Sequence, residues 1–234
     1  MAKNLHGLDR KMRRNGRSDL EDGDCWERLI RRVGIALGFL TILFPFLIYR
    51  RTSLRPTNRV AGSPPKSMTW PGMLLASFGY LALGIAGWHP LPVRLARWWQ
   101  RFCTAAGALL YFPGIGLYWW GLKTLGDFFR PSSSRRADLY TDHQLVVNGP
   151  YAILRHPMYL GVLMAAAGAL LIYRTWTTVI YALSSWVVLA RVHHEEAALE
   201  VMFGDEWVAY KAEIPAWFPA WFFPNKGRRT SHLM

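Results

Sequence analysis

Cysteine is scarce in this chain of 234 residues, which contains only Cys25 and Cys103. Two isolated thiols provide neither a disulfide framework nor the ligand spacing of a zinc site. Residues 1–28 are polar and charged, without an apolar core, so we expect no secretory signal peptide there. The end of the chain, Ser231 to Met234, lacks the cysteine that a lipidation motif needs.

Acidic residues are also few, and familiar nucleotide-binding motifs are missing. The chain has 15 Asp and Glu against 28 Lys and Arg, which gives a net charge of +13. No Walker-type loop, Rossmann fingerprint or hydrolase nucleophile elbow is present. Because the basic residues lie between apolar blocks, they fit anionic lipid headgroups better than nucleic acid. We therefore expect a lipid bilayer as partner and no nucleic acid.

Long apolar blocks separated by basic segments are typical of a membrane protein with several spans. We predict an all-α membrane protein of about five transmembrane helices with a C-terminal amphipathic helix. The predicted spans are residues 33–49, 70–88, 102–122, 157–173 and 176–192. Only Arg174 and Thr175 separate the last two spans, so these must form an antiparallel hairpin.

The chain divides by composition into four parts. We expect a mobile charged tail over 1–28, three transmembrane helices over 29–122, a core of loop, hairpin and amphipathic helix over 123–220, and a tail over 221–234.

In the core, apolar residues recur every three or four positions, which predicts that the fifth helix continues as an amphipathic helix and stops at Pro215. That stripe consists of Leu199, Phe203, Trp207, Tyr210 and Ile214. Five spans and the distribution of Lys and Arg favour a cytoplasmic C-terminus.

The stretch Asn148–Gly161, NGPYAILRHPMYLG, is the most informative in the chain. Arg155 and His156 stand directly before Pro157, which suits the first position of a helix. A helix N-terminus carries a partial positive charge and attracts anions. A second polar group ends the fifth span: Arg191, His193, His194, Glu195 and Glu196. The hairpin brings both groups to one membrane face, where they suit a substrate with an apolar tail and a polar head.

Each of these residues also has a simpler interpretation. Arg155 could be a headgroup anchor, His156 a turn residue, and the glutamate pair a charged helix exit. Only His193 and Glu196 could share an ion on one helical face, so we expect no metal site. Gly114 and Gly116 could admit a ligand, although small residues in membrane helices more often permit close packing.

Two motifs resemble a known group of membrane methyltransferases, which includes the isoprenylcysteine carboxyl methyltransferases and the phospholipid N-methyltransferases. One motif is Gly149-Pro150-Tyr151 with Arg155-His156-Pro157-Met158-Tyr159 and Gly161. The other is Glu195-Glu196, Leu199, Phe203-Gly204, Glu206, Tyr210, Ile214-Pro215 and Pro219, and LKTLG at 122–126 is similar to the segment before the first motif. The resemblance covers about residues 120–220.

The resemblance implies S-adenosylmethionine as methyl donor, bound near the cytoplasmic face. It places the donor's carboxylate at His156 and at the backbone of Gly149, Pro150 and Tyr151. It places the donor's ammonium group at Glu195 or Glu196. The donor-binding element also includes Pro157 and Tyr159.

The catalytic residues implied are Arg155, Arg191 and Glu196, with the two arginines orienting an acidic acceptor. The function implied is carboxyl O-methylation of an isoprenylcysteine-like, lipophilic or prenylated acceptor. The chain departs from the family at Trp207, where tyrosine is frequent, at Glu213, where a basic residue is common, and in a longer segment between Lys123 and Asn148. These departures concern the acceptor rather than the donor.

Other functions remain open at this level. An amine acceptor would make the chain a phospholipid N-methyltransferase, and it would need a base such as Glu or His. A sterol-reductase-like enzyme would take a nicotinamide cofactor instead, and a transporter or assembly factor would bind no donor. The sequence does not specify an oligomeric state.

Overall fold

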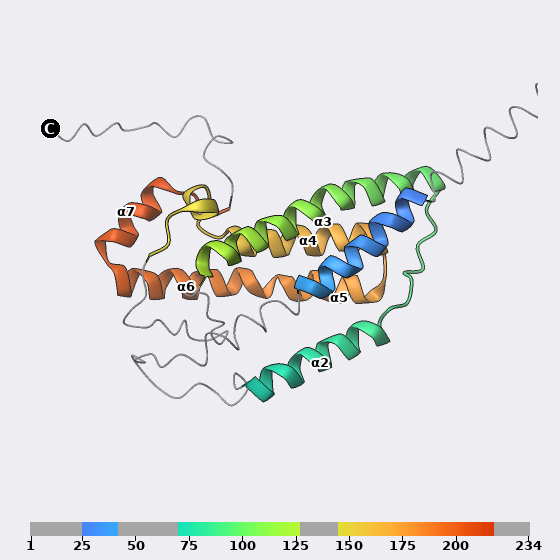
Figure 1. Ribbon diagram of the computed structural model, residues 1–234, viewed down its shortest axis with the longest axis horizontal. Coiled ribbons are helices and arrows are strands. Elements are labelled where there is room, and N and C mark those ends of the chain that lie inside the picture. Colours follow the sequence, from blue (N-terminus) through green and yellow to red (C-terminus); the bar gives the residue numbers. More distant parts are fainter. Residues whose placement is uncertain (1–24, 42–69, 127–144, 218–234) are drawn as a thin grey trace, which may run out of the picture.

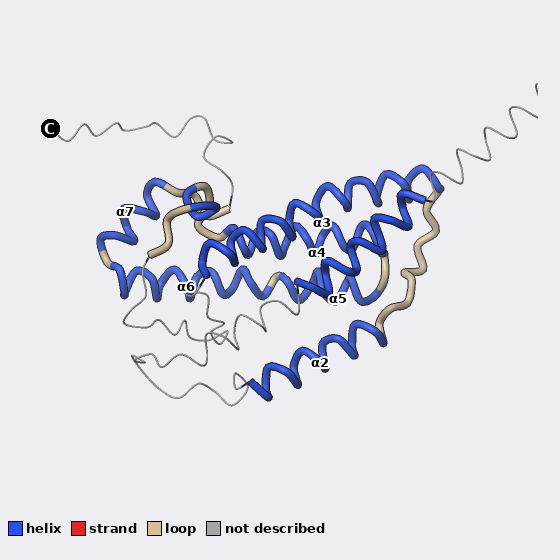
Figure 2. Tube along the Cα trace, in the orientation of Figure 1, coloured by secondary structure: helices blue, strands red, loops and turns tan. Residues whose placement is uncertain are grey.

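The computed structural model describes residues 25–41, 70–126 and 145–217, and its regular elements in these ranges are helices (Figures 1 and 2). A first helix covers residues 25–41. The others are α2 (Trp70–Ala86), α3 (Arg97–Leu125), the short 3-10 helix η3 (Gly149–Ala152), α4 (Pro157–Tyr173), α5 (Trp176–Ser185), α6 (Val187–Phe203) and α7 (Asp205–Glu213). The prediction of an all-α fold is confirmed for the described residues.

The helices form an elongated bundle with two distinct ends (Figure 1). The α4–α5 turn lies at one end with the beginning of α3 and the end of α2, and we refer to it as the hairpin-turn end. The opposite end holds η3, the end of α6, and α7. Chain direction reverses between α4 and α5, which confirms the predicted hairpin. Residues before α4 and residues late in α6 are therefore neighbours in space.

Glycines bring α3 and α4 into direct backbone contact. Gly107, Gly114 and Gly121 recur every seven residues in α3, and Gly161 and Gly168 do so in α4. A Cβ atom on Gly114 would lie 2.8 Å from the carbonyl oxygen of Gly161, and one on Gly168 would lie 2.6 Å from that of Gly107. Close approach at small residues is a standard way to join membrane helices. The packing interpretation therefore holds for Gly114, whereas a Cβ on Gly116 would meet no atom within 4 Å.

The helix over 25–41 is joined to α3 and α4 by hydrogen bonds from aromatic side chains. The Tyr111 hydroxyl donates to the Gly34 carbonyl at 2.7 Å, and the Tyr173 hydroxyl donates to the Arg31 carbonyl at 2.8 Å. The Trp119 indole donates to the Thr41 hydroxyl at 2.9 Å. These bonds satisfy aromatic N–H and O–H donors that would be costly to leave without partners away from water.

The hairpin turn is tied to the loop that follows α2. The Leu91 amide donates to the Arg174 carbonyl at 2.8 Å, and the Trp176 amide donates to the His89 carbonyl at 3.1 Å. Thr175 and Thr178 form a reciprocal capping box at the start of α5. Together these bonds fix where α4 ends and α5 begins.

The surface of the bundle is rich in large apolar side chains, as a bilayer requires. Leu75, Leu109 and Val201 are each at least three-quarters exposed. Within the described residues, Arg97–Leu125 is long and apolar enough to cross a membrane, and Ser77–Ala86 and Pro157–Tyr173 are shorter apolar stretches. The number of five spans stays a prediction.

Two helices extend beyond the apolar blocks from which we predicted them. The first begins at residue 25, inside the predicted mobile tail, because charged residues also form helix: Arg31 pairs with Glu27 one turn earlier at 3.9 Å. Helix α3 covers Arg97–Leu125 rather than 102–122. Hydropathy misses such ends because Arg, Lys and Trp are compatible with helix and suit the membrane interface.

The predicted fifth helix is broken twice. It divides into α5 and α6 at Trp186, and α6 ends at Gly204, which adopts a φ of +49°. The prediction of one continuous amphipathic helix to Pro215 was therefore wrong, because a glycine with positive φ turns the chain before Trp207. Its end before Pro215 was right, since α7 stops at Glu213.

Several predictions lie outside the described residues. These are the tail over 1–24, the second half of the first span over 42–49, much of the 123–156 loop, and the tail over 221–234. The division of the chain into four parts stays a prediction.

Candidate functional site

The site is built at the end of the bundle opposite the hairpin turn, where η3 leads into α4. Gly149 has a φ of +59°, and a Cβ there would lie 2.8 Å from the Thr124 hydroxyl at the end of α3. Pro150 and Pro157 are fully buried. The two prolines and the glycine fix the backbone on both sides of Arg155 and His156, so these side chains enter the site from a rigid segment.

Glu196 of α6 is the centre of a charged cluster. Its Oε1 atom lies 2.5 Å from Arg155 Nη1 and 3.0 Å from His156 Nε2. Its Oε2 atom lies 3.8 Å from Lys211 Nζ. Glu196 and two of its neighbours are well shielded, with side-chain exposures of 18% for Glu196, 12% for Arg155 and 4% for His156. The predicted meeting of the two polar groups is therefore found in the structure.

Glu195 enters a separate hydrogen bond beside this cluster. The Tyr159 hydroxyl donates to Glu195 Oε2 at 2.5 Å, and the same hydroxyl interacts with Arg191. Tyr159 lies nearly parallel to His156, with ring centroids 5.7 Å apart. Arg191, Glu195 and Tyr159 thus stand together on the facing sides of α4 and α6.

Helix α7 and the residues after it cover the segment before α4. The Tyr210 hydroxyl donates to the Tyr151 carbonyl at 2.7 Å, and the buried Trp207 ring lies 5.9 Å from the Arg155 guanidinium. The backbone amides of Arg155 and His156 donate to the carbonyls of Pro215 and Ala216 at 2.9 and 3.3 Å. Residues 207–216 therefore contact the segment that carries Arg155 and His156.

Four residues at the site had no functional role predicted for them. They are Trp207, Tyr210, Lys211 and Trp217. Trp207 and Tyr210 were assigned to an apolar stripe, and the turn at Gly204 directs both toward the segment 149–156 instead. The ion pairs of Lys211 with Glu196 and Glu200 could not be predicted from their spacing in the sequence. These contacts form because the chain turns between α6 and α7.

The two remaining histidines of the second polar group are placed differently. His193 and His194 are exposed, and His193 Nδ1 lies 3.4 Å from the Leu189 carbonyl of its own helix. In the described part of the chain, no three His, Cys, Asp or Glu side chains are arranged to hold a metal ion. The structure thus brings one imidazole, that of His156, to the glutamates.

The interior of the site favours uncharged tyrosines around its charged pairs. Burial raises the pKa of the Tyr151 hydroxyl well above its usual value, and the neighbouring Glu195 carboxylate raises it further. Burial also raises the pKa of Tyr210 to about 12. Both hydroxyls therefore stay protonated at neutral pH, and that of Tyr210 donates to the Tyr151 carbonyl.

Two buried donors in this region have no acceptor among the described residues: Arg155 Nε and Trp207 Nε1. A buried N–H without a partner costs about 1–3 kcal/mol, so such groups indicate where a ligand oxygen would be accommodated. An amino-acid-like ligand needs donors for its carboxylate and an anionic oxygen for its ammonium group. Arg155, Trp207 and Glu195 offer these groups, and S-adenosylmethionine carries such an amino-acid end, so the residues present fit it.

Comparisons with known proteins place this part of the chain near one family. Residues 108–201, which include α4, Arg155, His156 and both glutamates, match the isoprenylcysteine carboxyl methyltransferase family. The chain is thus similar to this family over that segment. It is 29% identical over 163 residues to the protein-S-isoprenylcysteine O-methyltransferase of Rattus norvegicus, covering 66% of this chain and 56% of the rat protein.

Two further relatives match shorter stretches. The identity is 30% over 129 residues with protein-S-isoprenylcysteine O-methyltransferase B of Arabidopsis thaliana, covering 47% of this chain and 66% of that protein. The identity is 35% over 111 residues with the protein-S-isoprenylcysteine O-methyltransferase of Schizosaccharomyces pombe, covering 42% of this chain and 47% of that protein. The chain therefore spans little more than half the length of the mammalian relatives that it matches.

A solved structure shares the fold. The eukaryotic intramembrane Ras methyltransferase ICMT superposes with a TM-score of 0.53 at 19% identity, covering 82% of this chain and 67% of that one. At this identity the likeness concerns the arrangement of helices. It shows that the helical fold found here also occurs in an intramembrane enzyme of the family.

Proposed function

We propose that the chain is an S-adenosylmethionine-dependent membrane methyltransferase that forms the methyl ester of an isoprenylcysteine-like carboxylate. The observation that carries the proposal is the meeting of Arg155 and His156 with Glu195 and Glu196 inside the segment that matches the family. When bound, S-adenosylmethionine supplies a methyl group activated on a sulfonium.

The chain's own residues would hold that donor by its amino-acid end. Arg155 Nε and the Trp207 indole N–H offer donors to a carboxylate, and Glu195 offers an acceptor to an ammonium group. Glu196 is already surrounded by Arg155, His156 and Lys211. We therefore assign Glu196 to positioning Arg155 and His156, and Glu195 to the ammonium group.

Methyl transfer to a carboxylate needs alignment and exclusion of water more than a strong base. A carboxylate acceptor is ionised at neutral pH, so a guanidinium that holds it is sufficient. Arg191 lies on α6 one turn before Glu195 and interacts with Tyr159, whose ring stacks with that of His156. We propose that Arg191 orients the acceptor carboxylate while the apolar helix faces receive its lipophilic tail.

The chain would be a multi-pass membrane protein with this site on the cytoplasmic side. The proposal is supported by the exposed apolar side chains of the bundle and by the five apolar blocks of the sequence. It is also supported by the basic residues, because 15 of the 28 Lys and Arg fall in segments expected on the side of the site.

The donor part of the proposal is tested by calorimetric titration of the detergent-purified protein with S-adenosylhomocysteine. We expect micromolar binding, lost in His156→Ala, because that imidazole is buried against Glu196. His193→Ala is the matched control: it removes an exposed imidazole of the neighbouring group and should bind like the parent.

Titration with a reduced nicotinamide nucleotide distinguishes the reductase alternative. Binding of the nicotinamide with no binding of S-adenosylhomocysteine would refute the methyltransferase proposal. Absence of binding of either ligand to folded protein would refute it as well and would favour a non-enzymatic role.

A further inference from the structure

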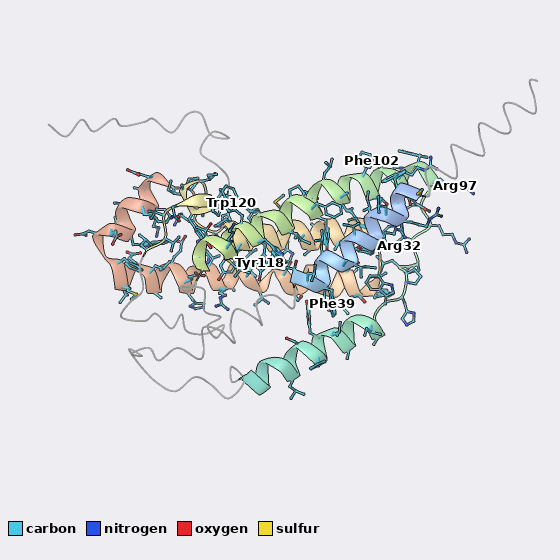
Figure 3. The ribbon with its side chains drawn as sticks, in the orientation of Figure 1. Arg32, Phe39, Arg97, Phe102, Tyr118 and Trp120 are labelled. Atoms are coloured by element: carbon cyan, nitrogen blue, oxygen red, sulfur yellow. The ribbon has the colours of Figure 1, made fainter. Side chains whose placement is uncertain are left out.

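A second polar cluster lies at the hairpin-turn end of the bundle, far along the helices from the candidate site (Figure 1). Arginines gather there from three segments, and Figure 3 shows Arg32 and Arg97 among them. The set comprises Arg28, Arg31 and Arg32, then Arg94, Arg97 and Arg101, and finally Arg174. Among the described residues at this end, Glu27 is the one carboxylate.

Within this set, Arg31 and Arg174 form a pair held by the backbone. The Tyr173 hydroxyl donates to the Arg31 carbonyl at 2.8 Å, which brings the residue next to Arg174 against the first helix. The Arg174 guanidinium donates to the Leu171 carbonyl at 2.8 Å. Burial lowers the pKa of the Arg174 guanidinium, and the positive charge of Arg31 lowers it further.

Among the described residues, the charge of this pair is only partly balanced. Glu27 Oε2 is 3.9 Å from Arg31 Nη2, which is an ion-pair distance but too long for a hydrogen bond. Arg31 Nε is buried without an acceptor among the described residues. Two guanidinium groups facing one carboxylate leave a net positive charge and unused donors in a fork geometry that suits phosphate oxygens.

The backbone at Arg174 also keeps the pair in place. Arg174 is the one non-glycine residue of the described chain with a positive φ, at +52°. Its amide donates to the Leu170 carbonyl, and its carbonyl accepts from the Leu91 amide. A neutral residue with better access to this conformation, such as asparagine, would satisfy the turn equally well. The turn alone therefore does not call for an arginine.

The pair lies at a depth where lipid headgroups would be found. Trp98, Trp99 and Phe102, in the first turns of α3 at the same end, are exposed by 62%, 44% and 59%. Trp98 and Trp99 stack with ring centroids 4.2 Å apart. Exposed aromatic side chains of this kind mark the boundary between hydrocarbon and headgroups.

We infer that Arg31 and Arg174 bind the phosphate of an anionic phospholipid headgroup between the first helix and the α4–α5 turn. Basic pockets between membrane helices bind such headgroups through the same chemistry. The phosphate would accept hydrogen bonds from both guanidinium groups and balance the positive charge that Glu27 does not neutralise. This inference does not depend on the proposed methyltransferase activity.

The test is thermal unfolding of the detergent-purified full chain titrated with dioctanoyl phosphatidylglycerol. We expect a saturable rise in melting temperature and an apparent affinity that falls at least tenfold in Arg31→Gln and in Arg174→Asn. Arg94→Gln is the matched control, because Arg94 is an exposed cation at the same end, outside the pair. Arg31→Lys keeps the charge without the fork and should bind with intermediate affinity.

The outcomes separate the possible ligands. A response to phosphatidylglycerol but not to glycerol 3-phosphate assigns the site to a lipid, and equal responses assign it to the phosphate group itself; both support an anion site. No saturable response in the parent chain would overturn the inference. An equal loss of affinity in Arg94→Gln would also overturn it, because it would show attraction by overall charge.

Discussion

At the scale of single residues, Glu196 has the largest number of charged neighbours in the candidate site. Arg155 and His156 share one carboxylate oxygen, and Lys211 approaches the other. Lys211 is 44% exposed, so its pair with Glu196 contributes little. The shielded contacts to Arg155 and His156 contribute most of the stabilisation, because removing one partner leaves a charge in a poorly solvated place.

Replacement of Glu196 by glutamine should therefore release Arg155 and His156 from their common anchor. We expect Glu196→Gln to weaken S-adenosylhomocysteine binding by about 10- to 100-fold, as expected for a loss of about 1.5–3 kcal/mol in hydrogen bonds to charged groups. Glu200→Gln removes an exposed carboxylate that pairs with the exposed Lys211, and it should change binding less than about twofold. Calorimetry on both variants measures this. Equal affinity in the two variants would contradict the role of Glu196.

A second prediction at the residue scale concerns the Tyr210 hydroxyl and the stability of the fold at alkaline pH. Folding raises its pKa from 10.0 to about 12, so the neutral hydroxyl stabilises the folded state fully below pH 10, and this stabilisation is lost as the pH rises toward 12. Tyr210→Phe removes the bond to the Tyr151 carbonyl and should lower the unfolding free energy by about 0.5–1.5 kcal/mol at neutral pH. The difference from the parent should shrink between pH 10 and 12. If the difference in unfolding free energy between parent and variant grew over this range, folding would lower the pKa of Tyr210 rather than raise it.

At the scale of elements, the contact between α3 and α4 places the site, because α3 ends beside Gly149 and α4 begins at Pro157. The contact depends on glycines rather than on large interlocking side chains. Heptad spacing of glycine is visible in the sequence at 107, 114 and 121. The partner helix and the exact pairing with Gly161 and Gly168 are not, since they follow from how the hairpin packs in three dimensions.

Gly114→Ala tests this contact. The new Cβ would lie 2.7 Å from the Ala165 amide nitrogen and 2.8 Å from the Gly161 carbonyl oxygen, and backbone atoms cannot move aside cheaply. We expect a loss of about 1–3 kcal/mol, as in other overpacked cores, seen as a lower melting temperature in detergent. Gly116→Ala, two residues away on an open face, should be neutral or slightly stabilising. Equal melting temperatures in both variants would argue against direct backbone contact.

The turn between α6 and α7 gives the second element-scale prediction. Gly204 has a φ of +49° and a ψ of −121°, a conformation that residues with a Cβ strongly disfavour. Gly204→Ala should displace α7, and with it Trp207 and Tyr210, and should weaken S-adenosylhomocysteine binding severalfold. Gly79→Ala, in an open position of α2, should leave binding unchanged. Unchanged binding in Gly204→Ala would show that α7 does not help to form the site.

At the scale of the whole molecule, much of the fold could be predicted from the sequence where a local signal marks an element's end. Pro157 and the Arg174-Thr175 turn bound α4, and the prediction matched both of its limits. The same hairpin was enough to bring Arg155 and His156 to the glutamates. The breaks at Trp186 and Gly204 were missed because hydropathy does not respond to a glycine φ or to a short irregularity in an apolar run.

The part of the site contributed by α7 was missed for the same physical reason. A helical stripe assumes one continuous axis, and the turn at Gly204 gives Trp207, Tyr210 and Lys211 a new direction. Their contacts with Arg155, Tyr151 and Glu196 are long-range consequences of that turn. The individual roles of Arg155, Arg191, Glu195 and Glu196 in binding and catalysis stay predictions.

The whole molecule also separates two kinds of polar chemistry along its length. One end holds the glutamates and tyrosines of the proposed methyltransferase site, and the other holds the arginines of the proposed headgroup site, with apolar helices between them (Figures 1 and 3). This separation means that each site can be altered without touching the other. Arg174→Asn should thus leave S-adenosylhomocysteine binding intact.

The most direct measurement is transfer of a labelled methyl group from S-adenosylmethionine to N-acetyl-S-farnesylcysteine by the full chain in lipid nanodiscs. The proposal predicts a base-labile methyl ester on the farnesylated carboxylate, formed by the parent chain and strongly reduced in Glu196→Gln. Label appearing in phosphatidylethanolamine instead, or no transfer by protein that binds S-adenosylhomocysteine, would contradict carboxyl methylation of an isoprenylcysteine.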